Sequence, residues 1–188
     1  MTTTTKARLN GVDIERLGAT IEAIQGQPAL ARFQFRARNE WLRGGLNRST
    51  IQGFLGAGQE DQTRTRPFVL DNDEPDVLLG EDQAANPVEY VLHALAGCLT
   101  TSLVYHAAAR GLRVDRVESR LEGDLDLRGF LGLSPQVRNG YQAVRVSMRV
   151  EGDITDAQRQ ELIELACRRS PVFDMLSNPV EVSVRAER

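Results

Sequence analysis

Hydrophobic positions follow two different periods along the chain, and their order predicts a mixed α+β fold. Apolar or small residues alternate with charged ones from Val117 to Leu127, and apolar residues alternate again from Val144 to Val150. A period of two is typical of antiparallel strands with one buried face. A period of three to four residues predicts helices over residues 10–24, 86–110 and 155–169. The pattern favours an antiparallel sheet packed on a buried helix.

Both ends of the chain carry further strand signals. Phe33 and Phe35 alternate with polar residues in a predicted strand over 30–42, and Gly44-Gly45 predicts a turn into a returning strand at 49–55. Another strand is expected at 66–70. Near the other end, Ser170-Pro171 stops one helix and begins a short one, and alternating valines at 180, 182 and 184 predict a final strand.

The longest apolar run predicts a central helix. Asn86 suits its N-cap, Pro87 its first position and Glu89 a capping box, and Gly111 ends it. The stretch from Val91 to Ala109 approaches membrane-spanning length, but it contains two histidines and several hydroxyl residues. We therefore predict a buried central helix and no membrane partner.

Length and composition indicate a single globular domain with an N-terminal arm. The chain has 188 residues, of which 41% are hydrophobic and 26% charged. We expect residues 1–9 to form a disordered N-terminus, residues 10–28 an N-terminal helical extension, and residues 29–188 the folded domain. The sequence shows no internal repeat and no linker long enough to divide it.

Charge and cysteine content narrow the classes of function. A net charge of −3 and a pI near 5.5 argue against nucleic acid as the main partner. The N-terminal Met-Thr-Thr-Thr-Thr-Lys lacks an apolar segment, so we expect a cytoplasmic protein. In a reducing compartment, paired thiols are more often catalytic than structural. The acidic stretch 71–82 lacks the spacing of a calcium loop and is expected to be solvated, and no metal site is predicted.

Cys98 is the strongest candidate for chemistry. Thr101, Ser102 and Tyr105 share its helix face, and Gly97 beside it allows another backbone or a substrate to approach. A mid-helix cysteine by itself is more often a core residue. Neither histidine is placed for a Cys-His pair, and a cation that favours the thiolate would have to be an arginine from elsewhere. Glycine-rich phosphate loops and nucleophile elbows are absent from the sequence.

The motifs around Cys98 carry a resemblance to a known family. Asn86-Pro-Val-Glu89, followed by Leu92-His-Ala-Leu-Ala-Gly-Cys-Leu99, is similar to the central-helix signature of the OsmC/Ohr family, the osmotically induced and organic hydroperoxide resistance proteins. The similarity continues through Ala108-Ala-Arg-Gly111, Leu125-Asp-Leu-Arg-Gly129 and Ser170-Pro-Val172, and covers roughly Pro67 to Val184. It implies an OsmC-like fold and an intertwined homodimer.

The resemblance also implies thiol peroxidase chemistry without a cofactor. Cys98 would be the peroxidatic cysteine, which attacks an organic or hydrogen peroxide and becomes a sulfenic acid. Cys167 would be a possible resolving cysteine, and an external dithiol would reduce the resulting disulfide. Glu89 and an arginine from the N-terminal hairpin would orient the thiolate. Arg48 is the preferred arginine and Arg43 the other candidate, while Thr101, Ser102 and Tyr105 would line the substrate site.

The chain departs from the peroxidase pattern at three places. Ser170 stands where the peroxidases have their resolving cysteine, and Cys167 lies one helical turn earlier. Glu89 precedes Cys98 by nine residues instead of ten, so a capping role competes with a catalytic one. Leu46, not arginine, follows the Gly44-Gly45 turn.

These departures leave two alternatives to a two-cysteine peroxidase. The first is a non-catalytic OsmC-like protein that binds a small hydrophobic ligand at the dimer interface. The second is a one-cysteine peroxidase in which an external thiol resolves the oxidised Cys98. Under the first alternative, Cys167 is a core residue.

Overall fold

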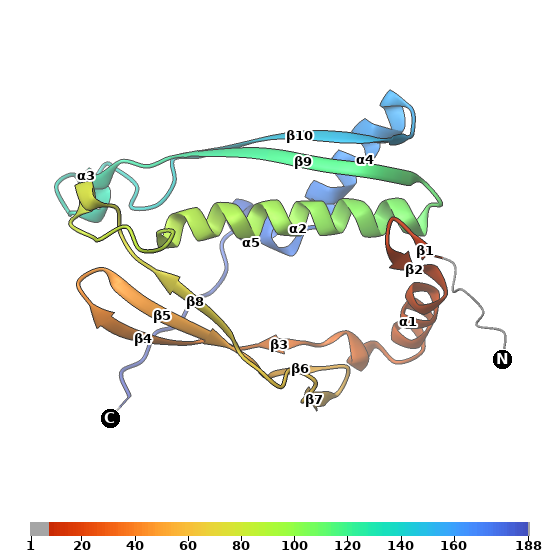
Figure 1. Ribbon diagram of the computed structural model, residues 1–188, viewed down its shortest axis with the longest axis horizontal. Helices are drawn as coiled ribbons and strands as arrows, with labels where there is room; N and C mark the ends of the chain where they lie inside the picture. The colour runs from red at the N-terminus through yellow and green to blue at the C-terminus, as the bar shows by residue number, and fades with distance from the viewer. Residues whose placement is uncertain (1–7, 188) are drawn as a thin grey trace. The chain divides into compact units, whose positions relative to one another are not determined.

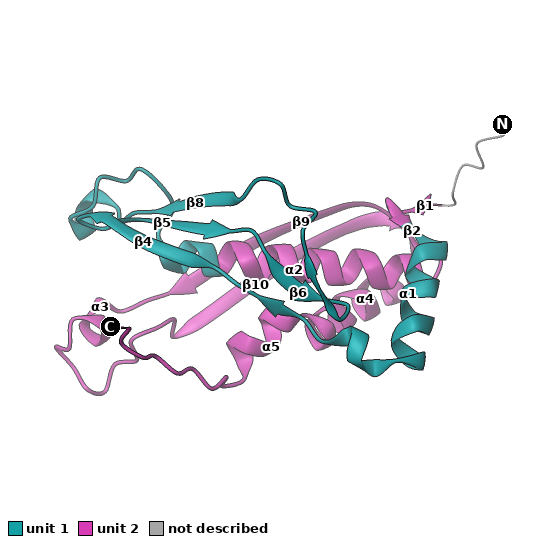
Figure 2. Ribbon diagram, turned by 90° about the horizontal axis from the view of Figure 1, so that it is seen from below, with its two compact units in different colours: residues 1–6, 13–91 teal, residues 7–12, 92–188 magenta. Residues whose placement is uncertain are grey.

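The computed structural model describes residues 8–187, which divide between two compact units. Unit 1 contains residues 13–91, and unit 2 contains residues 8–12 and 92–187, as coloured in Figure 2. Residues 1–7, most of the predicted disordered N-terminus, lie outside the described part. Arg8 and Leu9 instead form a short strand, β1 (Arg8–Leu9), which pairs with β2 (Val12–Asp13).

The N-terminal helix begins later in the chain than the predicted start at Asn10. It begins at Ile14 because Asn10 and Gly11, with φ of 53° and 80°, form the turn between β1 and β2. The side chain of Asp13 then accepts a hydrogen bond from the Arg16 amide and caps α1 (Ile14–Gly26). The short 3₁₀ helix η1 (Pro28–Ala31) follows.

Unit 1 otherwise consists of two antiparallel three-stranded sheets. The first has the order β3-β6-β7 and the second β4-β5-β8. The turn predicted at Gly44-Gly45 is confirmed between β4 and β5. The predicted strand 30–42 begins only at Gln34 and is interrupted at Arg36 and Ala37, and the predicted strand 49–55 is interrupted at Gln52 and Gly53. The strands are β3 (Gln34–Phe35), β4 (Arg38–Arg43), β5 (Leu46–Ile51), β6 (Phe54–Gly56), β7 (Gln59–Asp61) and β8 (Phe68–Asn72), followed by η2 (Asp76–Leu78).

Unit 2 is built on the central helix α2 (Pro87–Ala109), whose first turn belongs to unit 1. The helix ends within one residue of its predicted C-terminal end. Leu95, Leu99, Leu103 and Ala107 recur every four residues and are at most 3% exposed. The long hairpin of β9 (Arg113–Asp124) and β10 (Ala143–Asp153) runs alongside this helix (Figure 1). By length and composition α2 could span a membrane, but these four residues belong to the core of unit 2.

The two C-terminal helices complete the core of unit 2. α4 (Asp156–Arg169) contributes buried Leu162 and Ala166, and its predicted capping box between Thr155 and Gln158 is confirmed. α5 (Pro171–Ser177) follows directly. The chain is therefore the α+β protein, with antiparallel sheets and a long helix, that the sequence predicts.

Two strand predictions in unit 2 were wrong, one in its extent and one altogether. β9 ends at Asp124, not at Leu127, because Asp126 caps the short helix α3 (Leu127–Phe130) by accepting from the Arg128 amide. Residues 180–184 form no strand, and Val180, Val182 and Val184 are 54%, 80% and 91% exposed. Alternation makes a segment suited to a strand, but a strand also needs a neighbour to which it can hydrogen-bond.

Candidate active site

Cys98 lies on α2 at the border between its buried and exposed faces. Its neighbours Leu95 and Leu99 are buried, while Gly97 is exposed and Cys98 itself is half-buried as a free thiol. A Cβ atom placed on Gly97 would meet no heavy atom within 4 Å. The surface of α2 at Gly97, the residue before Cys98, therefore has room for a side chain.

Hydroxyl side chains continue this face toward the C-terminal end of α2. Ser102 is half-buried, whereas Thr101 is exposed and Tyr105 is 52% exposed. At three, four and seven residues from Cys98 they share its side of the helix. Their assignment to substrate binding stays a prediction.

Cys167 is also a free thiol, and it packs on the apolar core of unit 2. One turn later, Ser170 is only 1% exposed, and its hydroxyl caps α5 by accepting a hydrogen bond of 3.2 Å from the Phe173 amide. The residue at the family's resolving position is thus a structural cap here. The resolving role of Cys167 stays a prediction.

Glu89 forms the predicted capping box at the start of α2. Its carboxylate accepts from the Asn86 amide at 2.9 Å, and the Asn86 side chain accepts from the Glu89 amide at 2.9 Å. The capping role of Glu89 is confirmed by these two hydrogen bonds. Its catalytic role stays a prediction.

Both candidate arginines are held by carboxylates of unit 1. Arg48 on β5 donates two hydrogen bonds to Asp71, at 2.7 and 2.8 Å. These bonds, with the attraction between the charges, raise the pKa of Arg48 and lower that of Asp71. Arg43 at the end of β4 donates to Glu81 at 2.5 Å. An arginine that orients a thiolate would have to leave or share such a carboxylate.

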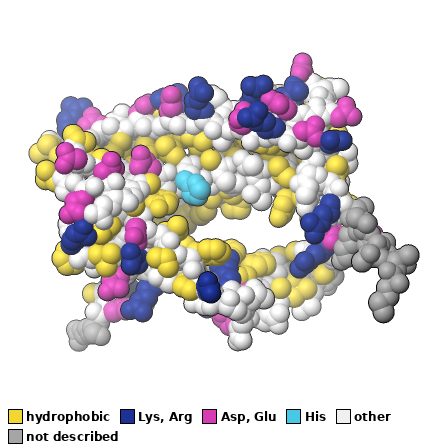
Figure 3. Space-filling model, in the orientation of Figure 1, with side chains coloured by type: hydrophobic (Ala, Val, Ile, Leu, Met, Phe, Trp, Pro, Cys, Tyr) yellow, Lys and Arg dark blue, Asp and Glu magenta, His cyan; other side chains and the backbone are white. Residues whose placement is uncertain are grey.

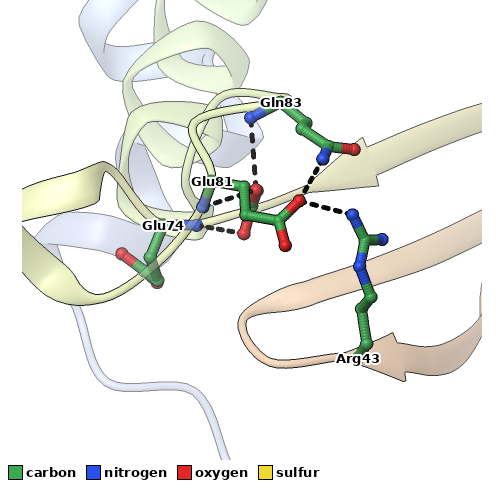
Figure 4. Close-up of polar contacts among 5 residues, drawn as sticks. Arg43, Glu74, Glu81 and Gln83 are labelled. Carbon is green, nitrogen blue, oxygen red and sulfur yellow. Dashed lines mark hydrogen bonds and ion pairs between the residues drawn. The ribbon is translucent and has the colours of Figure 1, made fainter.

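The acidic stretch 71–82 is more ordered than the expected solvated loop. Asp73 is 2% exposed, and its carboxylate accepts from the amides of Glu74, Glu81 and Gln83 at 2.9–3.2 Å. Figure 4 shows this arrangement, with Glu81 turned toward Arg43. A small pocket of about 120 Å³ lies here, beside Gly44 and Gly45. Asp73 could not be singled out from the sequence, because nothing in a run of acidic residues marks which one folds inward.

Replacing Asp73 by asparagine is expected to destabilise unit 1 in a pH-dependent way. The three hydrogen bonds from backbone amides, of which that from Gln83 has the largest effect, hold the pKa of Asp73 below its unfolded value of 3.8. The stabilisation is therefore present above about pH 4 and is lost as the pH falls through the lower folded pKa. Urea unfolding of the wild type and of Asp73→Asn at several pH values should show a difference in the free energy of unfolding that decreases toward acidic pH. A difference in the free energy of unfolding that is the same at pH 3 and pH 7 would contradict stabilisation by the ionised Asp73.

Both histidines lie on α2. His93 is exposed on α2, and His106 is half-buried near its end. Burial, and then the charges of Arg110 and Arg169, lower the pKa of His106. Within residues 8–187, no three histidine, cysteine, aspartate or glutamate side chains are grouped to hold a metal ion.

Comparisons with known structures agree on one fold. An OsmC-like protein from Mycoplasma pneumoniae has a TM-score of 0.60 at 13% identity, covering 78% of this chain and 89% of that one. An organic hydroperoxide resistance protein from Elizabethkingia anophelis has a TM-score of 0.56 at 15% identity, covering 79% and 91%. A Legionella pneumophila protein described as an organic hydroperoxide resistance protein and predicted redox protein has a TM-score of 0.54 at 17%, covering 76% and 88%. At these identities the likeness concerns the fold alone.

Comparison by sequence identifies the family directly. No curated protein matches the chain. The family model for OsmC-like proteins matches residues 80–185, which is more than half of the chain and includes α2 with Cys98. The chain therefore belongs to the OsmC-like family.

Proposed function

We propose that the protein is a thiol-dependent peroxidase that reduces organic or hydrogen peroxides through Cys98. The observation that carries the proposal is a free, half-buried thiol on the central helix of an OsmC-like protein, next in sequence to the unobstructed Gly97. Several structural neighbours bear the name organic hydroperoxide resistance protein. These names support the proposal, and at 15–17% identity the structural likeness itself concerns the fold.

The proposed reaction needs only the thiol and an external reductant. The Cys98 thiolate attacks one peroxide oxygen, the O–O bond breaks, and the leaving oxygen takes a proton and departs as an alcohol or water. Cys98 is then a sulfenic acid. A second thiol condenses with it, releasing water, and a dithiol reduces the disulfide. In this proposal the protein works in the reducing cytoplasm.

Ser170 favours a one-cysteine version of the reaction as the second candidate. It occupies the family's resolving position, and its hydroxyl is committed to the N-terminus of α5. Cys167 is a free thiol packed against the core of unit 2. A non-catalytic binding protein is the third candidate, supported by the carboxylate partners that already engage Arg43 and Arg48.

Intact-mass measurement after one equivalent of peroxide should separate these candidates. Loss of two hydrogens from the wild type indicates a disulfide between Cys98 and Cys167, and gain of one oxygen, absent in Cys98→Ser, indicates a stable sulfenic acid. The proposal expects one of these changes within the first minutes. An unchanged mass at both cysteines would leave only the binding protein.

We also propose that the protein is a homodimer. Unit 1 exposes a set of large apolar side chains, and hydrophobic side chains lie among charged ones on the face in Figure 3. Exposed apolar surface on this scale is typical of an interface. The most exposed aromatic members are Phe33, Phe35, Trp41 and Phe68, between 51% and 70%.

A further inference from the structure

The chain contains two Asn-Gly pairs, and both belong to unit 2. They are Asn10-Gly11 and Asn139-Gly140. Asparagine is chemically labile, and most so before glycine, because glycine has no side chain to keep its amide nitrogen away from the asparagine side-chain carbonyl. The two pairs share this local chemistry, so a large difference in reactivity between them has to come from the fold.

Asn10 is held by both polar atoms of its side-chain amide. Its nitrogen Nδ2 donates to the Leu112 carbonyl at 2.9 Å, and its oxygen Oδ1 accepts from the Val114 amide at 2.9 Å. These two residues lie on either side of Arg113, where β9 begins. We call this pair of hydrogen bonds the Asn10 latch, since it ties the turn between β1 and β2 to the start of β9.

The Asn10 latch opposes the geometry that deamidation needs. In that reaction the Gly11 nitrogen attacks the side-chain carbonyl carbon of Asn10, so the amide group has to turn toward Gly11. Turning breaks both bonds of the latch, which are part-buried. Two hydrogen bonds of ordinary strength make such an opened state at least about tenfold rarer.

Asn139 lies between α3 and β10 without a comparable restraint. Its side chain is exposed, and within unit 2 as described no hydrogen bond engages its amide group. Backbone hydrogen bonds hold the Val137 and Gln142 amides on either side, and Asn139 and Gly140 form a bend between them. A Cβ atom placed on Gly140 would meet nothing closer than the Arg138 Nε at 3.8 Å, so this backbone has room to move.

We propose that Asn139 is a site of spontaneous deamidation in the folded protein, and that the Asn10 latch protects Asn10 from the same reaction. The Gly140 nitrogen attacks the side-chain carbonyl carbon of Asn139 and forms a C–N bond. The side-chain nitrogen leaves as ammonia and takes the Gly140 amide proton with it. Water then opens the resulting ring at either carbonyl and gives aspartate or isoaspartate. No electrons are transferred, and water is the only co-reactant.

The modification changes charge and backbone length at one place in the loop that joins β9 to β10. Asn139 becomes a carboxylate next to Arg138, and isoaspartate also lengthens the backbone by a methylene group. Tyr141 follows closely, and its ring lies over Gly123 of β9, where a Cβ atom would meet it at 2.4 Å. We expect the longer backbone of isoaspartate to loosen this contact.

Peptide mapping by mass spectrometry tests both halves of the proposal. The folded protein is incubated in mildly alkaline buffer, and the exchange of the amide NH₂ for OH is followed in the peptides that contain Asn10 and Asn139. Asn139 should convert at least about tenfold faster than Asn10. In concentrated urea, which unfolds the chain and removes the latch, the two residues should convert at similar rates.

Two variants separate the latch from local sequence. Gly140→Ala has room for its methyl group and should slow the conversion of Asn139, while Asn10 behaves as in the wild type. Asn10→Ala removes the latch and should speed hydrogen exchange of the Val114 amide at least about tenfold. The Val146 amide, in the middle of β10, is the control and should exchange as in the wild type.

Three outcomes would overturn the proposal. The first is equal conversion of Asn10 and Asn139 in the folded protein, and the second is an Asn139 that converts only in urea. The third is a difference between the two that persists in urea, because it would then come from local sequence. Peroxide turnover is measured separately, so an inert Cys98 refutes the proposed function and leaves this result intact.

Discussion

Replacement of Cys98 by serine should reduce peroxide consumption at least about 100-fold, to the rate of the uncatalysed mixture. The sulfur of Cys98 is the atom that accepts oxygen in the proposed reaction, and a serine hydroxyl is a far weaker nucleophile at neutral pH. The two side chains are close in size, and Cys98 is only half-buried, so the variant should fold. The measurement is the loss of cumene hydroperoxide and of hydrogen peroxide with dithiothreitol as reductant.

Cys167→Ser is the matched control, because it removes the other free thiol from the same unit. If the protein is a two-cysteine peroxidase, this variant should consume peroxide slowly with a dithiol that acts by reducing the internal disulfide. The one-cysteine version predicts that the variant keeps its rate and accumulates Cys98 sulfenic acid when the reductant is limiting. If Cys98→Ser and the wild type consume peroxide equally fast, Cys98 is not the peroxidatic residue.

Replacement of Leu103 by alanine should destabilise unit 2 by about 2–5 kcal/mol. Leu103 is 0% exposed and lies at the centre of the core formed by α2, β9, β10 and α4. Truncation removes buried apolar contacts and leaves a cavity, because the surrounding helices and strands can collapse only in part. Urea unfolding followed by far-ultraviolet circular dichroism should report this loss of stability, with the same m-value fitted to both proteins.

Leu133→Ala provides the comparison at an exposed site of the same unit. Leu133 is 70% exposed, so the loss should stay within about 0.5 kcal/mol. A loss at Leu103 no larger than at Leu133 would contradict the assignment of α2 as the core helix. The same pair of variants also separates core stability from activity, since neither residue belongs to the candidate site.

The central helix shows how much local pattern can predict. Asn86 and Glu89 form the reciprocal cap that their spacing implies, and Gly111 follows the helix with a φ of +70°. The buried stripe from Leu95 to Ala107 follows from a period of four. Such features depend on residues within one or two turns of each other, so the sequence contains all that is needed to predict them.

Asp73 and the C-terminal valines show where local pattern is not enough. Asp73 resembles its acidic neighbours in sequence, and only the folding of residues 73–83 around it brings three amides to its carboxylate. Val180 to Val184 alternate as well as any strand here, yet their state depends on whether another strand lies beside them. Sequence spacing could suggest Arg48 and Arg43, but the structure alone revealed their partners, Asp71 and Glu81.

The sequence by itself determined the α+β class, the central helix with its caps, and the placing of Cys98 within an OsmC-like signature. Those properties arise from periodicity and short-range bonds. The tertiary structure decided which acidic residue is buried, that Ser170 is buried, which carboxylates hold the arginines, and that residues 180–184 form no strand. Each of these depends on contacts between segments distant in sequence, whose meeting no local pattern specifies.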